Sequence, residues 1–208
     1  MTSSFFAFLH RMRFIKRWGL MRNTETENIQ EHSLEVAFVA HNLACIKNEY
    51  FGGTVDVNKV AVMAMYHEVS EIFTGDMPTP IKYFDPKLRS LYGEVETLAQ
   101  EKMLSTLPAE LQATYKPMIV DAEESDEWSL VKAADTISAF MKCVHEKNAG
   151  NDEFNEAYSS ILQKLKDLHM PEVDKFLELY IPALSQSLDT LNYYDMTSKL
   201  CLYRRLCI

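Results

Sequence analysis

Helical periodicity runs through nearly the whole chain, and it limits the possible folds more than any other feature of the sequence. Strand-like alternation of apolar and polar residues is weak throughout. Glycine and proline, which interrupt helices, number only 6 and 7 in 208 residues. We therefore predict an all-α fold with helices over residues 3–13, 29–48, 56–73, 85–106, 108–115, 123–148, 151–168 and 170–192.

Turn residues gather where the predicted helices end. The second helix stops at "FGGT", the third at "GDMPTP" and the sixth at "NAGN". No repeat, low-complexity segment or linker divides the chain, so we predict a single-domain helical bundle over residues 1–192. The tail over residues 193–208 follows no clear pattern. It is either a short helix or a partly ordered end that packs on a partner.

The formal net charge of −9 makes the chain a poor candidate for binding nucleic acid polymers or anionic membranes, which both attract positive proteins. The sequence contains no apolar run of about 18 residues, so we predict no membrane-spanning helix. The apolar and basic N-terminus is interrupted by His10, Arg11 and Arg13, so we interpret it as an amphipathic helix and not as an export signal.

The four cysteines are Cys45, Cys143, Cys201 and Cys207, and no pair has the C-x-x-C spacing of zinc or redox motifs. Cys45 and Cys143 lie in apolar helical patterns and are expected in the core. Nothing in the spacing indicates disulfides, so we expect a cytoplasmic protein.

The stretch "MAMYHEVSEIFTGDMPTP" places His67, Glu68 and Glu71 at the end of an apolar helix. Residues 60–66 are apolar nearly all round, which predicts burial. His67 and Glu71 are four residues apart and share a helix face, with Glu68 one step round. Imidazole and carboxylate groups gathered in this way are typical of a metal site. The alternative is a histidine at a helix end with two solvated glutamates.

Two further residues bear on this choice. His32 lies near the start of the second predicted helix, and Asp135 lies in the middle of the sixth. Taken alone, His32 is more typical of a surface or core histidine, and Asp135 of a solvated or paired carboxylate. A buried carboxylate must be paired, hydrogen-bonded or bound to a metal. Together the residues give the order His…His-Glu…Asp, with each part on a separate helix.

This order resembles the His…His-Asp…Asp pattern of the HD-domain metal-dependent phosphohydrolases, and within them the bacterial 5'-deoxynucleotidases of the YfbR type. The His-x-x-x-Glu-x-x-x-Gly-Asp-x-Pro-Thr-Pro run is the most specific part. The resemblance covers the chain to about residue 190 and implies an HD-type helical bundle. It is carried, in the family's order and spacing, by "FFAFLHRMRFIKRWGLMRNTETENIQEHSLEVAFVAHNLA", "AVMAMYHEVSEIFTGDMPTPIKYF", "SLVKAADTISAFMKC" and "FLELYIPALSQSLD".

The resemblance implies hydrolysis of 2'-deoxyribonucleoside 5'-monophosphates to deoxynucleoside and phosphate. It implies a divalent ion, Co²⁺ or Mn²⁺, held by His32, His67, Glu68 and Asp135, which binds the phosphate and lowers the pKa of the attacking water. One departure is that Glu68 stands where the family pattern has Asp. Glutamate keeps the charge and the oxygen donors but is one methylene longer. We expect a working site, with altered metal preference or weaker binding as alternatives.

The resemblance also assigns roles around the ion. Glu71 would orient or deprotonate the nucleophilic water, and Asp76 would either protonate the leaving 5'-oxygen or hold the sugar 3'-hydroxyl. Arg17 would hold the phosphate, although it is also one charge of a basic stretch. Trp18 would line the sugar pocket and exclude a 2'-hydroxyl. The alternative is that Trp18 packs in the core and anchors the first helix.

Three further residues are candidates for contact with the substrate. His32 would face the substrate in addition to binding the ion. Thr79 and Lys82 could reach the phosphate or the base edge, with solvated surface as the alternative for Lys82.

The resemblance implies a homodimer, and the apolar N-terminal cluster Phe5, Phe6, Phe8 and Leu9 and the last helix could supply either interface or core. Other HD-type enzymes, such as a guanosine tetraphosphate hydrolase or a deoxynucleoside triphosphohydrolase, are the first alternative. A nucleotide- or metal-binding domain without turnover is the second, because of Glu68. A helical scaffold without a site is the third.

Overall fold

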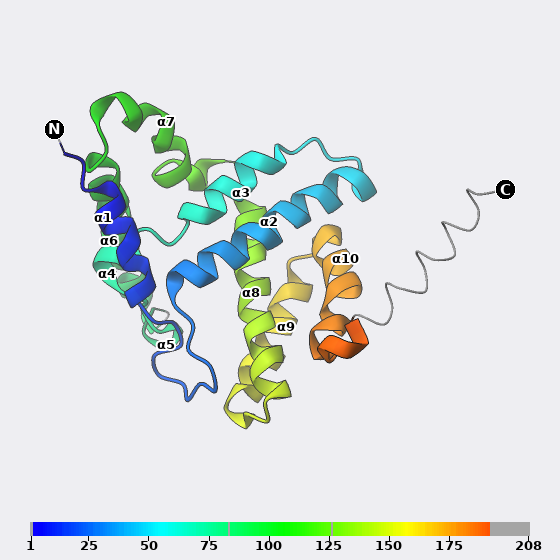
Figure 1. Ribbon diagram of the computed structural model, residues 1–208. Helices are drawn as coiled ribbons and strands as arrows, with labels where there is room; N and C mark the ends of the chain where they lie inside the picture. The colour runs from blue at the N-terminus through cyan, green and yellow to red at the C-terminus, as the bar shows by residue number, and fades with distance from the viewer. Residues whose placement is uncertain (1, 83, 126, 192–208) are drawn as a thin grey trace.

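The computed structural model describes residues 2–82, 84–125 and 127–191, and their regular elements are all helical (Figure 1). The predicted all-α class is confirmed. Among these residues, β-type pairing is limited to one isolated bridge between Lys16 and Asn28. The α-helices are α1 (Phe5–Leu9), α2 (Ile29–Phe51), α3 (Val57–Tyr66), α4 (Glu71–Thr74), α5 (Thr79–Lys82), α6 (Pro86–Ser105), α7 (Ala109–Ile119), α8 (Trp128–Asn148), α9 (Asn155–Asp167) and α10 (Pro171–Tyr180). Four 3₁₀ turns join them: η1 (His10–Phe14), η2 (Ala122–Glu124), η3 (Asp152–Phe154) and η4 (Ile181–Ser185).

The helix ends follow from local side-chain chemistry. The Asn28 side chain accepts backbone N–H groups in the first turn of α2, while Glu31 accepts the Asn28 N–H in return. Gly52 ends this helix in the left-handed region, at φ 69°. The side chains of Asp56 and Asp85 likewise accept backbone N–H groups in the first turns of α3 and α6.

Several predicted helices are shorter than expected. The helix predicted over 3–13 is α-helical only over Phe5–Leu9 and continues as the 3₁₀ turn η1. The helices predicted over 123–148 and 151–168 begin at Trp128 and Asn155.

The helix predicted over 56–73 stops at Tyr66, because the chain tightens into i→i+3 hydrogen bonds before α4 begins. The helix predicted over 170–192 stops at Tyr180, and Pro182, which has no N–H to donate, lies in the 3₁₀ turn that follows. The predicted tail over 193–208 lies outside the described residues.

Two smaller expectations concern membranes and cysteines. Across the described part of the chain, every helix is too short or too polar to cross a membrane. Cys143 is buried, as predicted. Cys45 is only partly buried, and its Sγ lies 3.8 Å from Nδ1 of His41.

The hydrophobic core consists of two clusters that meet at helix α2. The larger cluster joins α2 to α3, α8 and α10, and the smaller one joins η1 and α1 to α6 and α7 (Figure 1). On α2, Ile29 belongs to the smaller cluster and Val36 to the larger. His32 lies between them, one turn from each. Helix α2 therefore places His32 where the two clusters meet.

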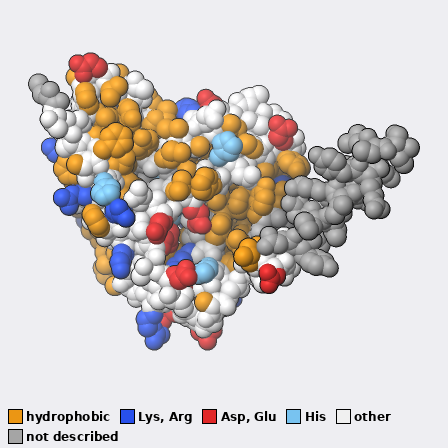
Figure 2. Space-filling view, in the orientation of Figure 1, with side chains coloured by type: hydrophobic (Ala, Val, Ile, Leu, Met, Phe, Trp, Pro, Cys, Tyr) orange, Lys and Arg blue, Asp and Glu red, His pale blue; other side chains and the backbone are white. Residues whose placement is uncertain are grey.

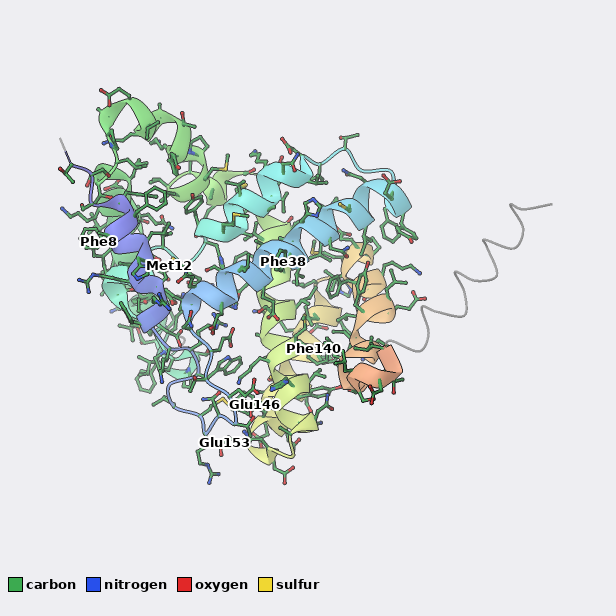
Figure 3. All side chains as sticks on the ribbon, viewed as in Figure 1. Phe8, Met12, Phe38, Phe140, Glu146 and Glu153 are labelled. Atoms are coloured by element: carbon green, nitrogen blue, oxygen red, sulfur yellow. The ribbon has the colours of Figure 1, made fainter. Side chains whose placement is uncertain are left out.

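A buried carboxylate fastens the segment between η1 and α2 to helix α8. Glu146 is fully buried and accepts hydrogen bonds from the Thr24 N–H at 2.9 Å, from the Thr24 hydroxyl at 2.7 Å and from Asn151 at 2.8 Å. Lys142 donates a further, charged hydrogen bond. Burial opposes ionisation, but these donors lower the pKa of Glu146 well below its usual range. Figure 3 shows Glu146 near the lower end of α8, beside this segment.

We expect Glu146→Ala to lower the free energy of unfolding by about 3 kcal/mol, because it leaves Lys142 and Thr24 without their buried partner. Urea unfolding at neutral pH measures the change. Glu153→Ala is the matched control, since Glu153 pairs with the highly exposed Arg22, and it should change the stability by about 0.5 kcal/mol or less.

Wild type and Glu146→Ala can also be compared as a function of pH. The folded pKa of Glu146 lies below the unfolded value of 4.5, so its stabilisation is complete above that value and is lost as the pH falls toward the folded pKa. The stability difference between wild type and Glu146→Ala should therefore shrink in acid. A difference that stays constant well below this pH would contradict the role of the carboxylate.

Candidate active site

Four side chains with metal-binding donors converge from three parts of the fold. His32 comes from the first turn of α2, His67 and Glu68 follow the end of α3, and Asp135 lies in α8. One donor atom from each lies within 4.8 Å of those of the other three. The structure thus brings together the four residues that the sequence predicted as ligands, although they span more than 100 positions of the chain.

The two imidazoles turn their Nε2 atoms toward the carboxylates. Nε2 of His32 lies 3.2 Å from Asp135 Oδ1, and Nε2 of His67 lies 3.3 Å from Glu68 Oε1. Both Nε2 atoms are buried, and neither makes a hydrogen bond of good geometry with any described residue. Buried polar atoms rarely stay unsatisfied in proteins, so the pair fits a cation that accepts both lone pairs.

The opposite ring nitrogens are fixed by the protein. Nδ1 of His67 lies 2.7 Å from the Ala64 carbonyl and therefore carries a proton that it donates. Nδ1 of His32 lies 3.1 Å from Ser138 Oγ and 3.4 Å from a Glu27 oxygen. A protonated Nδ1 leaves Nε2 free to bind a metal, which is the usual arrangement of metal-binding histidines.

The carboxylates of the cluster are anionic. Burial opposes this, but His67 lowers the pKa of Glu68 to about 2, and His32 and Lys132 lower the pKa of Asp135 well below its usual range. The donor set therefore combines two imidazoles with two negative charges. It matches the preferences of a divalent ion of borderline hardness.

Glu71 and Asp76 lie beside the cluster, with pKa values shifted the other way. Burial raises the pKa of Glu71 to about 10, and the charges of Glu68 and Asp76 add to the effect. Burial also raises the pKa of Asp76, against the opposing charge of Arg17. Oε2 of Glu71 has no hydrogen-bond partner among the described residues. A carboxyl group that holds its proton beside a cation site is suited to general acid–base chemistry.

Arg17 places a guanidinium group close to the carboxylates of the site. Its side chain is 12% exposed, and its Nε lies 3.5 Å from Glu27 without a hydrogen bond. Burial opposes its charge, but the carboxylates of the site, with Glu27 the strongest, raise its pKa. A buried guanidinium among carboxylates is in place to hold an anionic group by two parallel hydrogen bonds.

Trp18 follows Arg17 in an unusual backbone conformation, with φ at 60°. Its indole Nε1–H donates to Glu27 at 2.9 Å, and its ring lies 5.4 Å from the ring of Phe154. The Trp18 backbone also lies close enough to the Asp76 carboxylate to oppose the rise in its pKa. Trp18 therefore lies near Asp76 and packs on η3.

The last two predicted substrate residues lie on α5. Thr79 is exposed at its first position. The Lys82 ammonium donates to Glu96 on α6 at 2.9 Å and lies 5.2 Å from the ring centre of Tyr92. Lys82 is therefore paired with α6 in this structure.

Sequence reasoning missed several residues that the structure places at the site. The Lys132 ammonium lies 3.6 Å from Asp135 Oδ2, and helical spacing from Asp135 could have identified it. Ser138 and Glu35 support His32 on the Nδ1 side of its ring. The Ser138 oxygen lies near Nδ1 of His32, and the Ser138 hydroxyl donates to Glu35. Glu27 precedes the first helical turn, where no periodicity marks it.

A cavity of about 320 Å³ lies next to His32, between α2 and α8. Glu27, Glu31 and Glu35 line it from the side of α2, and Lys142 and His145 from α8.

A helical bundle that gathers two histidines and two carboxylates at one site is the arrangement expected of the HD-domain phosphohydrolases, and solved structures of that class share this fold. An HD-domain phosphohydrolase from Listeria innocua matches with a TM-score of 0.76 and 26% identity, over 87% of this chain and 88% of that one. The cyanophage S-2L HD phosphohydrolase DatZ, solved with dA and one catalytic Zn²⁺, matches with a TM-score of 0.63 and 20% identity, over 90% and 99%.

The family follows from closer relatives. The family model described as 5'-deoxynucleotidase YfbR-like matches residues 4–184. A 5'-deoxynucleotidase of Photorhabdus laumondii is 47% identical over 191 residues, which cover 91% of this chain and 97% of that protein. One from Vibrio vulnificus is also 47% identical over 191 residues, covering 91% and 98%. The chain therefore belongs to the YfbR-like 5'-deoxynucleotidase family, and the resemblance seen in the sequence is confirmed.

We expect the protein to bind a divalent metal ion, and His67→Ala to weaken this binding by more than the roughly 10–100-fold typical of losing an outer partner of a ligand. Titration calorimetry on metal-stripped protein measures the affinity. His41→Ala, on the exposed face of α2, should bind like wild type. Equal affinity in the two variants would show that the ion binds elsewhere.

Proposed function

We propose that this protein hydrolyses 2'-deoxyribonucleoside 5'-monophosphates to deoxynucleosides and phosphate at the cluster of His32, His67, Glu68 and Asp135. It is a 5'-deoxynucleotidase, a phosphoric monoester hydrolase. The observation that carries the proposal is the pair of buried, unpartnered Nε2 atoms facing two carboxylates, in a chain of this family.

The donor set is that of a divalent-metal site, and we assign Co²⁺ or Mn²⁺ to it. Imidazole combined with carboxylate suits both ions. When bound, such an ion supplies Lewis acidity that polarises phosphoryl oxygens and acidifies a water molecule. Glu68 serves in place of the family's aspartate, because the carboxylate of the longer side chain still reaches the cluster.

Arg17 holds the phosphate in this proposal. Its guanidinium is buried among carboxylates and has an unpartnered Nε, so an incoming phosphate would supply hydrogen-bond acceptors that Arg17 lacks. Lys132 adds a second positive charge beside Asp135. Lys82 would contact the phosphate or the base only after leaving Glu96, and Thr79 would act at the outer rim.

Glu71 handles the proton of the attacking water. Its high pKa reflects burial and the neighbouring carboxylates Glu68 and Asp76, and a cation held by Glu68 would lower that pKa. Glu71 can then accept a proton near neutral pH. Asp76 lies near Arg17 and the Trp18 backbone, where it serves either the leaving 5'-oxygen or the sugar 3'-hydroxyl. Trp18 borders the sugar and excludes a 2'-hydroxyl.

We also propose a homodimer in the cytoplasm. Of the N-terminal apolar cluster, Phe5 is buried, Phe8 and Leu9 are partly buried, and Phe6 is 69% exposed. Hydrophobic side chains gather at the upper left of Figure 2, in the region of α1 and α7. Sedimentation of wild type and Phe6→Asp tests this face. The free thiols of Cys45 and Cys143 favour a reducing compartment.

We expect metal-stripped protein with added Co²⁺ or Mn²⁺ to release phosphate from dAMP and to release little from AMP or dATP. Glu71→Gln should lower kcat by about 10²–10⁴-fold, the usual contribution of a general base. Glu94→Gln, an exposed change on α6, should leave kcat unaltered. A malachite-green phosphate assay measures all of these rates.

Two outcomes would contradict the proposal. If folded, metal-loaded protein leaves dAMP intact, the enzyme function is wrong. If dATP is hydrolysed faster than dAMP, the protein is a triphosphohydrolase instead.

A further inference from the structure

One carboxylate outside the ligand cluster contacts three side chains of the site. Oε1 of Glu27 lies 3.4 Å from Nδ1 of His32 and 3.5 Å from Nε of Arg17. Its Oε2 accepts the indole N–H of Trp18 at 2.9 Å. The Glu27 side chain is 16% exposed, so little water competes for these contacts.

The Glu27 backbone fixes the same segment. Its carbonyl accepts the Arg17 N–H at 3.0 Å, next to the bridge between Lys16 and Asn28. Trp18 has φ at 60°, a left-handed conformation that is unfavourable for a residue with a side chain. The backbone bond to Arg17 and the indole bond to Glu27 hold Trp18 in it.

His32 has a second support that differs in kind. The Ser138 hydroxyl lies 3.1 Å from Nδ1 of His32 and donates its own proton to Glu35. Ser138 therefore acts on the ion side of the site alone, whereas Glu27 reaches His32, Arg17 and Trp18 together. Loss of Ser138 should therefore affect the orientation of His32 alone. Loss of Glu27 should affect the ion site and the phosphate site together.

We propose that Glu27 is a positioning residue that couples ion binding to phosphate binding. A single carboxylate orients His32 toward the ion and Arg17 and Trp18 toward the substrate. The inference rests on the proposed function for the identity of the substrate. The coupling itself is measurable by binding, without turnover.

Glu27→Gln is the informative change. A glutamine keeps the shape, and its amide oxygen can still accept from Trp18. Its amide N–H₂ replaces the second acceptor and faces the donors on His32 and Arg17. Because the substitution is isosteric, the melting temperature should stay near that of wild type, which separates positioning from a general loss of structure.

We expect Glu27→Gln to weaken the affinity for Co²⁺ and the affinity of the Co²⁺-loaded protein for inorganic phosphate, each by about tenfold. The KM for dAMP should rise as the phosphate affinity falls. Ser138→Ala should weaken Co²⁺ binding alone. Glu25→Gln, an exposed change two residues away, should alter neither constant. Titration calorimetry and the visible spectrum of bound Co²⁺ give both readings.

If Glu27→Gln changes only one of the two affinities, or neither, the coupling role is refuted. The same holds if Ser138→Ala reproduces both effects. A wild-type protein that binds Co²⁺ and phosphate but leaves dAMP intact would refute the substrate assignment, while the two affinities still decide the role of Glu27.

Discussion

The rest of this structure depends on two buried imidazole nitrogens that have no hydrogen-bond partner among the described residues. The rings of His32 and His67 lie 5.2 Å apart between centroids, and their Nε2 atoms share one space with two anionic carboxylates. Such a group is unfavourable in a protein interior unless a cation balances it. The helices that carry it must therefore be held together by other interactions, and α2, α3 and α8 are packed in the larger hydrophobic cluster.

The position of the site at the border of two cores explains how it can be both rigid and accessible. His32 is fixed between Ile29 and Val36, which lie in different clusters. Glu71 and Arg17 come from segments outside the larger cluster, and polar contacts hold the segment of Arg17. Glu146 on α8 and the Glu27 carbonyl secure its two ends. Apolar packing thus places the four side chains of the candidate metal site, and buried hydrogen bonds hold the segment that carries Arg17.

Helical periodicity predicted α2 and α8, because it is a local signal of the sequence. The closeness of His32, His67 and Asp135 followed from the resemblance to a known family and not from any local signal, and the structure places their donor atoms within 4.8 Å of one another. The break after Tyr66 leaves no such signal, because it depends on how the backbone tightens around His67. Glu27 was also not predicted, because it lies in a loop where no helical periodicity relates it to its partners. Lys132 is a different case, because its helical spacing from Asp135 was visible in the sequence.

Charge balance explains how a chain with a net charge of −9 can accept an anionic substrate. Glu68 and Asp135 carry two negative charges, which a divalent ion would neutralise. The ion site alone then offers no net attraction to a phosphate dianion. The remaining positive charge must come from Arg17 and Lys132, which flank the cluster from the segment before α2 and from α8. Local cations, and not the field of the whole molecule, therefore decide which anion binds.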